Sequence, residues 1–348
     1  MLTSVPIQYV LALSFVYLIS CVIVYYVLPR KDSVLYGHPA GLAVLVFVIT
    51  LVVRLIPAMI LPRGAQYDIE SFQRVSETFL RGEGVYSSPV VAGRHPYFPF
   101  QVYLIGVAMW LSKGTGLPFV STVKWAPILA DSGLTVLIFH AILQSGSSTA
   151  QAFVSSLLYA FNPVSVLVTA YHGQFDAESA FLLALSWYFW HFDSKPERKI
   201  VFSALALGLA VLNKTWPALF LPIVLLRLRS TRQRLAYGLI TLAIPIIFTT
   251  LYVVAFREDP NPLLKRALTH AGVPGWWGPG AAVNILRAIV GWGEPVLNWL
   301  TRYSRWFVFA GVGLAYWLTR RQASVEALTT TILALYVSTS GFGVQWLL

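Results

Sequence analysis

Apolar residues in this chain occur in long continuous runs separated by short polar segments. A run of about 20 apolar residues has the length of a helix that crosses a hydrocarbon layer roughly 30 Å thick. The runs do not alternate between apolar and polar positions, which excludes a closed β-barrel. The pattern therefore predicts an all-α fold, a polytopic bundle of transmembrane helices. Predicted spans cover residues 6–28, 39–61, 98–112, 124–144, 150–172, 176–192, 200–226, 235–256, 305–319 and 323–343.

The distribution of Lys and Arg predicts the orientation of these spans. By the positive-inside rule, short basic loops are cytoplasmic, and the N-terminus then lies outside. The loop residues concerned are Arg30, Lys31, Lys113, Lys124, Lys195, Arg198, Lys199, Arg227, Arg229, Arg232, Arg234, Arg320 and Arg321. This orientation requires the runs 150–172 and 200–226 each to cross twice, with breaks expected at Asn162-Pro163 and near residues 213–217. A single crossing of 150–172 would reverse its exit. The total is about ten to twelve spans.

Two longer polar segments, residues 62–97 and 257–304, fall on the outer side in this topology. Residues 69–80 place their apolar side chains on one helical face, which predicts an amphipathic helix on the membrane surface. Residues 282–300 predict a second interfacial helix. Because no repeat of fixed period and no low-complexity linker is present, residues 1–348 are expected to form one membrane-embedded domain.

Composition supports a membrane protein and excludes several other classes. The chain has 57% hydrophobic and 11% charged residues, a mean hydropathy of +0.68 and a net charge of +11. The positive excess follows from topology, so nucleic acid is not an expected partner. Cys21 is the only cysteine, which rules out an internal disulfide and a Cys-based metal site. No phosphate-binding loop, dinucleotide fingerprint, nucleophile elbow or zinc helix motif occurs.

A carboxylate follows the second predicted span directly, in the sequence Tyr67-Asp68-Ile69-Glu70. Asp68 is the leading candidate for a general base. The alternative is that Asp68 caps the amphipathic helix by accepting backbone N–H bonds. Glu70 is a candidate for substrate binding, although its first-turn position also suits the helix dipole.

Ionisable residues inside the apolar runs are informative because a charge in mid-bilayer costs about 3 kcal/mol. They are Arg54, Asp131, His140 and Lys214. Asp131 is expected to pair with Lys214 or Arg54. Lys214 precedes Trp216-Pro217, where a helix break would leave its ammonium facing a cavity; the alternative is that it extends to the outer interface.

Two further groups of side chains suit a polar ligand. His172, Gln174 and Asp176 form a dense patch whose donors and acceptors fit sugar hydroxyls; a metal is the less favoured ligand. In the second outer segment, cations suit a phosphate and the Trp pair suits a ring or a prenyl tail, with lipid headgroups as the alternative. The residues of this second group are Arg257, Lys265, Arg266, His270, Trp276 and Trp277.

In their order along the chain, these motifs resemble those of the GT-C superfamily of membrane glycosyltransferases. The likeness is carried by Asp68, the turn Arg94 to Pro99, Asn162-Pro163 before Gly173-Gln174-Phe175-Asp176, and Lys214 before Trp216-Pro217. The motifs are most similar to those of family members that use a polyprenyl-phosphate-linked hexose. These members include the glucosyltransferases of N-glycan precursors and the GPI mannosyltransferases. Gln345 matches that family's Gln-aromatic stretch, and family members continue past this point with more helices, so truncation at Leu348 is expected.

The resemblance implies an inverting transfer of mannose or glucose. Asp68 would be the base that deprotonates a hydroxyl of a glycan or glycolipid acceptor, with His172, Gln174 and Asp176 at the same cavity. The phosphate would leave toward Lys214, Arg257 or Arg266, and neither a nucleotide nor a metal cofactor is implied. The site would face outward from a prokaryotic cell membrane or, alternatively, into the lumen of the endoplasmic reticulum.

Two rival functions follow from the same residues. Buried charges and broken helices are also features of secondary transporters, although no symmetry between the two halves is found. A non-catalytic relative that only binds a lipid-linked glycan is the second rival.

Overall fold

The computed structural model describes residues 7–27, 37–61, 63–91, 93–269, 278–291 and 293–338, which contain helices and turns but no strand. The predicted all-α fold is confirmed for this part of the chain. The helices are α1 Ile7–Val27, α2 Pro39–Ile60, α3 Gln66–Leu80, α4 Phe100–Thr115, α5 Phe119–Thr122, α6 Trp125–Gln144, α7 Thr149–Ala160, α8 Pro163–Val166, η2 Leu167–His172, α9 Asp176–Phe192, α10 Pro196–Asn213, η3 Trp216–Phe220, α11 Leu221–Arg227, α12 Thr231–Phe256, α13 Pro260–Thr269, α14 Gly278–Val290, α15 Glu294–Thr319 and α16 Ser324–Ser338.

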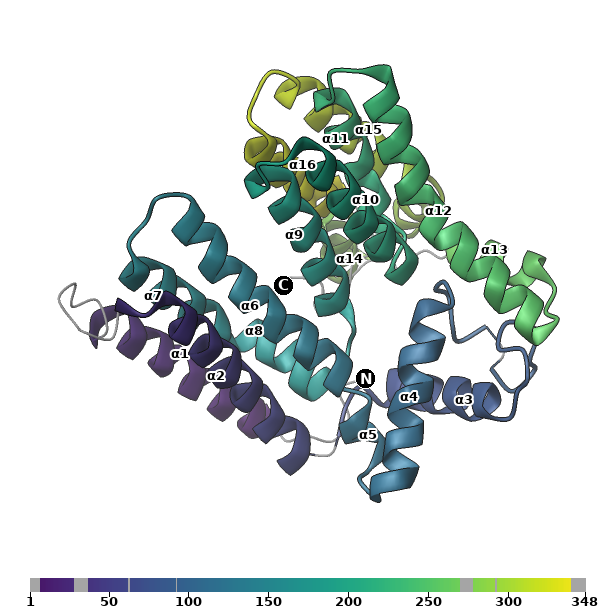
Figure 1. Ribbon diagram of the computed structural model, residues 1–348. Helices are drawn as coiled ribbons and strands as arrows, with labels where there is room; N and C mark the ends of the chain where they lie inside the picture. The colour runs from purple at the N-terminus through teal and green to yellow at the C-terminus, as the bar shows by residue number, and fades with distance from the viewer. Residues whose placement is uncertain are drawn as a thin grey trace.

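Two groups of long helices build the molecule (Figure 1). The first contains α1, α2, α6 and α7, and the second contains α9 to α12 with α15 and α16. They meet where α6 packs on α9. A Cβ atom at Gly133 of α6 would lie 2.8 Å from the ring of Phe181 of α9, so glycine permits this close approach. Small residues at such contacts are typical of helices packed within a bilayer.

Three helical segments are long and apolar enough to cross a membrane: Pro39–Ile60, Phe119–Gln144 and Thr231–Phe256. A fourth is obtained if the pair Thr149–Ala160 and Pro163–His172, bent by 47°, forms one span. The protein is therefore a membrane protein with three to four such helices in its described residues. The larger count of about ten to twelve spans, which relies on shorter helices, stays a prediction.

The break in the fourth span lies where the sequence predicts it. The first piece, α7, ends at Ala160. Asn162 caps the second piece, because its Oδ1 accepts a hydrogen bond of 2.9 Å from the backbone N–H of Val164. Pro163 follows as the first residue of α8, where its missing N–H leaves no donor unpaired. The second piece continues into η2, which ends at His172.

One end of the bundle collects three chain segments that are far apart in sequence. The backbone N–H of Ala65 donates to the His172 carbonyl at 3.2 Å, and the Lys124 ammonium donates to the Arg63 carbonyl at 2.5 Å. The Ser121 hydroxyl donates to the Ala58 carbonyl at 3.1 Å. The C-terminal ends of α2 and η2 therefore lie beside the start of α6. We call this end of the helix bundle the Asp68 end.

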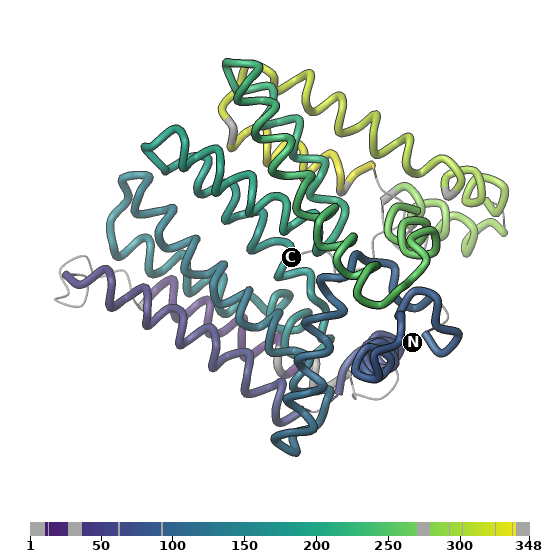
Figure 2. Tube along the Cα trace, turned by 45° about the vertical axis from the view of Figure 1, so that its right-hand side comes forward, coloured from purple at the N-terminus to yellow at the C-terminus, as the bar shows by residue number. Residues whose placement is uncertain are grey.

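The predicted span 98–112 and the placement of Lys124 in a cytoplasmic loop are wrong. At the start of α4, Gln101 donates to Glu178 in the first turn of α9. Residues 121–124, which follow α4, contact the end of α2. Both ends of this segment thus lie at the Asp68 end, and α4 runs across the long helices in both views (Figures 1 and 2). A helix of 16 residues with one buried face resembles a short span in composition alone.

Because residues 98–112 do not cross, residues 150–172 need to cross only once. Helix α6 starts at the Asp68 end and α7 returns from the far side after the turn at residues 145–148. A single bent passage then brings residues 172–176 to the Asp68 end. The described residues show neither the predicted span 98–112 nor the predicted double crossing of residues 150–172. Because one change of side offsets the other, residues 172–176 still lie beside Asp68, as predicted.

The opposite end, which we call the far end, carries basic turns, as predicted. Helices α10 and α12 run parallel, since Ser203 contacts Tyr237 and Thr241 donates to Ala204. For α12 to start at the same end as α10, the run 200–226 must reverse direction at Lys214 and return through η3 and α11. This reversal lies at the predicted break near residues 213–217. At the far end the Arg227 guanidinium donates to carbonyls of the α15–α16 turn. The other basic residues there are Lys195, Arg198, Lys199, Arg229, Arg232, Arg234, Arg320 and Arg321.

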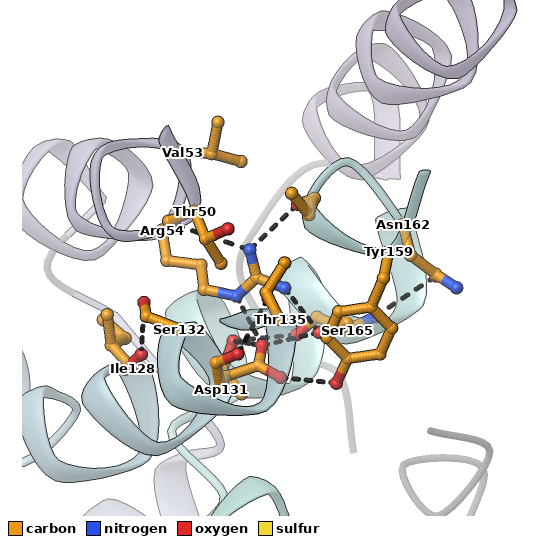
Figure 3. Close-up of polar contacts among 12 residues, drawn as sticks. Thr50, Val53, Arg54, Ile128, Asp131, Ser132, Thr135, Tyr159, Asn162 and Ser165 are labelled. Atoms are coloured by element: carbon orange, nitrogen blue, oxygen red, sulfur yellow. Dashed lines mark hydrogen bonds and ion pairs between the residues drawn. The ribbon is translucent and has the colours of Figure 1, made fainter. Parts of the chain in front are cut away.

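A fully buried ion pair joins the helices of the first group (Figure 3). Arg54 of α2 pairs with Asp131 of α6, so Arg54 and not Lys214 is the partner of Asp131. Tyr159 of α7 donates to Asp131 at 2.5 Å, and Ser165 of α8 donates to it at 2.6 Å. The Arg54 guanidinium also donates to the carbonyl of Ala160 at 2.8 Å. Both pieces of the bent span are thus bound to one carboxylate.

We expect Arg54→Met to lower the free energy of unfolding by about 3 to 5 kcal/mol, because it leaves the Asp131 carboxylate buried and unpaired. The double variant Arg54→Met/Asp131→Leu, which removes both charges, should be less damaged. Thermal unfolding of the purified proteins in one detergent measures both. A double variant that is no more stable than the single one contradicts this account.

Candidate functional site

Asp68 occupies the first turn of α3, just after the segment that leaves α2. Its side chain is 31% exposed, and its Oδ2 accepts a hydrogen bond of 2.6 Å from Gln174 Nε2. The Nδ1 atom of His172 lies 4.0 Å from the same oxygen. The N-cap of α3 is Ala65, so the alternative assignment of Asp68 as a cap is wrong. The carboxylate is held by a side chain from another part of the chain.

The turn between η2 and α9 delivers Gln174 to Asp68. Gly173 has φ +82°, a left-handed conformation that glycine adopts without strain. A Cβ atom there would also lie 3.2 Å from Ile69 and 3.4 Å from Lys124. The turn therefore packs closely against both α3 and the start of α6. His172 Nδ1 is buried in this turn without a hydrogen-bond partner among the described residues.

Asp176 and Lys214 form a buried ion pair beside this turn. The Lys214 ammonium also lies over two aromatic rings, 4.7 Å from the centroid of Phe175 and 5.5 Å from that of Tyr97. Both side chains are less than a tenth exposed. Lys214 therefore faces the protein interior and not the outer interface. The other carboxylate oxygen of Asp176 has no hydrogen-bond partner in the described part of the chain.

A second buried carboxylate, Glu178, was not recognised in the sequence. Its Oε2 accepts hydrogen bonds from Gln101 and, at 2.7 Å, from Asn213, which in turn accepts one from Ser179 at 2.7 Å. Glu178 lies two residues after Asp176, at the start of an apolar run, and Gln101 lies at the start of another apolar run. The sequence feature that could have predicted this contact is the presence of an acid and an amide, each at the start of an apolar run. The network joins α4, α9 and α10 beneath the site.

Burial raises the pKa of Asp68, and the neighbouring Asp176 adds to the rise. The hydrogen bond from Gln174 and the charge of Lys214 act in the opposite direction on this pKa. A carboxylate with a raised pKa is a stronger base, which suits the role of a proton acceptor. Burial also lowers the pKa of nearby His95 to about 3, so that imidazole stays neutral near pH 7.

Glu70 lies two residues after Asp68, about half a turn around α3, in a separate basic setting. Arg74 contacts its Oε1 at 2.5 Å, and Arg94 approaches its Oε2 at 3.4 Å. The Arg94 guanidinium lies 4.6 Å from the ring centroid of Tyr67. The hydrogen bond from Arg74 lowers the pKa of Glu70, which therefore remains a carboxylate. Glu70 joins the helix to the loop before α4.

Lys124, which the sequence pattern placed in a cytoplasmic loop, is a further candidate at the Asp68 end. Three Lys or Arg side chains are buried among the described residues: Arg54, Lys124 and Lys214. The first and third each have a carboxylate partner. The Lys124 ammonium has only the Arg63 carbonyl and, 6.0 Å from its centroid, the ring of Tyr171. It is a buried cation whose counter-charge is not supplied by the described residues.

The remaining predicted site residues lie apart from Asp68 or outside the described residues. Arg257 ends α12 and is exposed. Arg266 of α13 reaches the loop before α4, 3.9 Å from the Cβ position of Gly93. Helix α13 is held near that loop because Glu258 accepts a hydrogen bond of 2.7 Å from the Ser87 backbone (Figure 1). His270, Trp277 and Gln345 fall outside the described residues.

Within the described ranges, no group of three or more His, Cys, Asp or Glu side chains is arranged to hold a metal ion.

The raised pKa of Asp68 predicts that Asp68→Asn is more stable than the unmodified protein at neutral pH. The folded protein binds this proton more tightly than the unfolded chain, so the ionised carboxylate costs stability above its folded pKa. The difference should shrink as the pH falls toward about 3.9, the value of an unfolded Asp. Thermal unfolding at several pH values tests this. A variant that is less stable at neutral pH contradicts it.

Gln174→Leu should have the opposite effect, because Asp68 loses its donor. It should lower stability at neutral pH and leave it nearly unchanged in acid.

Comparison with known proteins adds no relative to this picture. No protein-family model matches the chain, and neither the curated proteins nor the solved structures contain a significant match.

Proposed function

We propose that this protein is a membrane glycosyltransferase of the kind that the GT-C-like motifs suggest. It transfers a hexose from a polyprenyl-phosphate donor to a hydroxyl of a glycan or glycolipid acceptor. The observation that carries the proposal is the setting of Asp68, a partly exposed carboxylate of raised pKa held by Gln174 at one end of a membrane bundle.

In this reaction Asp68 is the general base. Its Oδ2 is engaged by Gln174, whereas Oδ1 accepts no hydrogen bond from a described residue and is available for the acceptor hydroxyl. The hydroxyl oxygen attacks C1 of the hexose, its proton passes to Asp68, and the bond from C1 to the phosphate oxygen breaks. The phosphate keeps the electron pair. A single displacement inverts the configuration at C1.

The leaving phosphate is assigned to Lys124 in preference to Lys214. Because Lys214 is already neutralised by Asp176, a phosphate there would compete with a buried carboxylate. Lys124 has no carboxylate partner in the part of the chain that the structure describes, and buried charges are normally paired. The phosphate would replace the Arg63 carbonyl as the acceptor of the ammonium. Arg257 and Arg266 remain further cations on the same side, and Lys214 serves to position Asp176.

The proposed orientation places the Asp68 end outside and the basic far end in the cytoplasm. It is supported by the Arg and Lys residues of the far-end turns. Helix α3 and the segment 282–300 would lie at the outer surface, where the amphipathic pattern of each suits an interface. A prokaryotic cell membrane is the proposed location, with the lumen of the endoplasmic reticulum as the alternative.

We expect purified protein to transfer mannose or glucose from the matching polyprenyl-phosphate donor. Asp68→Asn should reduce kcat by about 10²-fold to 10⁴-fold, the range for loss of a general base. Glu83→Gln is the matched control, because Glu83 is an exposed acid of the same outer segment that pairs with Arg81. Full activity in Asp68→Asn overturns the assigned base. Transfer from neither donor would favour the rival functions, a transporter above all.

Orientation has a separate test, since Cys21 is the only cysteine. In a Cys21→Ala background, Glu83→Cys should react with a membrane-impermeant maleimide on intact cells. Lys195→Cys, in the exposed far-end turn, should react only after the cells are opened. The reverse pattern would place Asp68 in the cytoplasm.

A further inference from the structure

An apolar groove lies in the second helix group, on the far-end side of the site described above. It is open on one side and is bordered by α9, α10, η3, α11 and α16. Its wall includes Trp187, Trp190, Leu183, Phe220, Val224 and Leu328. The one hydroxyl in the wall, that of Ser186, already donates to the Ser203 carbonyl at 2.8 Å. The groove therefore suits a hydrocarbon chain.

One donor in the wall is left without a partner. The indole N–H of Trp187 is buried and makes no hydrogen bond with a described residue. A buried N–H without an acceptor destabilises the fold, so an oxygen from a bound molecule would complete this site. A plain hydrocarbon cannot supply that oxygen, whereas an ester or phosphate group can.

A cation lies beside the same wall. The Lys199 ammonium is 4.7 Å from the ring centroid of Trp190. Lys199 forms no ion pair within 4 Å among the described residues; the nearest acid, Asp193, acts on it only at longer range and contacts Arg198 at 3.5 Å. An apolar groove, an unpaired indole donor and an available ammonium thus occur together.

We propose that this groove binds one anionic phospholipid of the surrounding bilayer. One acyl chain lies between Trp187 and Leu328, the phosphate contacts Lys199, and an ester or phosphate oxygen accepts from Trp187 Nε1. The cation selects an anionic headgroup, because a zwitterionic lipid would bring its own positive charge to Lys199. A polyprenyl-phosphate substrate is not the occupant, since the proposed chemistry lies at the opposite end. The lipid site is independent of the proposed function.

Native mass spectrometry of the delipidated full chain tests this site. Phosphatidylglycerol and phosphatidylcholine with the same acyl chains are titrated separately. We expect one phosphatidylglycerol to bind at least about fivefold more tightly than phosphatidylcholine, the factor that one lysine supplies near a membrane surface. Lys199→Gln should abolish this preference, and Trp187→Phe, which keeps an aromatic ring but lacks the N–H, should weaken phosphatidylglycerol binding.

Lys195→Gln is the control, because Lys195 is an exposed cation of the same turn that does not lie on Trp190. It should keep the preference, as should Lys199→Arg. Equal binding of the two lipids by the unmodified protein overturns the proposal. An equal loss in Lys195→Gln would also overturn it, since it would show attraction to general surface charge. Glycosyl transfer plays no part in these outcomes, so failure here leaves the proposed function untouched.

Discussion

The ion pair between Arg54 and Asp131 is the contact on which the placement of the site depends. A charge in the apolar interior must be neutralised by a partner, and here the partner lies on another helix. Because Asp131 also accepts from Tyr159 and Ser165, it binds both pieces of the bent span. That span ends in the turn that carries Gln174, and Gln174 holds Asp68. The position of the partly exposed Asp68 carboxylate is therefore determined by a charge pair buried within the bundle.

The same end of the bundle combines a stabilising charge pair with a destabilising charge. Asp176 and Lys214 neutralise each other in the interior. Asp68 forms no ion pair with a Lys or Arg of the described residues, and its burial raises its pKa. A protein that keeps an ionised group under such conditions loses stability and gains a stronger base, the usual relation between stability and activity at functional sites.

Sequence reasoning identified the features that depend on composition along a run. The all-α fold, the break at Asn162-Pro163 and the basic far-end turns follow from apolar length, proline chemistry and charge. It failed at Lys124, because a buried lysine that donates to a carbonyl has the same one-dimensional pattern as a loop lysine. It also failed at Glu178, whose partners Gln101 and Asn213 come from two other helices. Contacts of this kind depend on packing, which no local pattern contains.

The arrangement of charges also bears on how the proposed transfer would proceed. As the acceptor proton moves to Asp68, that carboxylate loses its charge, and the leaving phosphate gains one. Negative charge thus moves away from the neighbourhood of Asp176 and toward Lys124, a buried cation with no carboxylate partner among the described residues. Electrostatic groups that are fixed before reaction favour the state in which charge has moved in their direction. The unpaired lysine, which would be a defect in a purely structural bundle, then has a physical reason to be there.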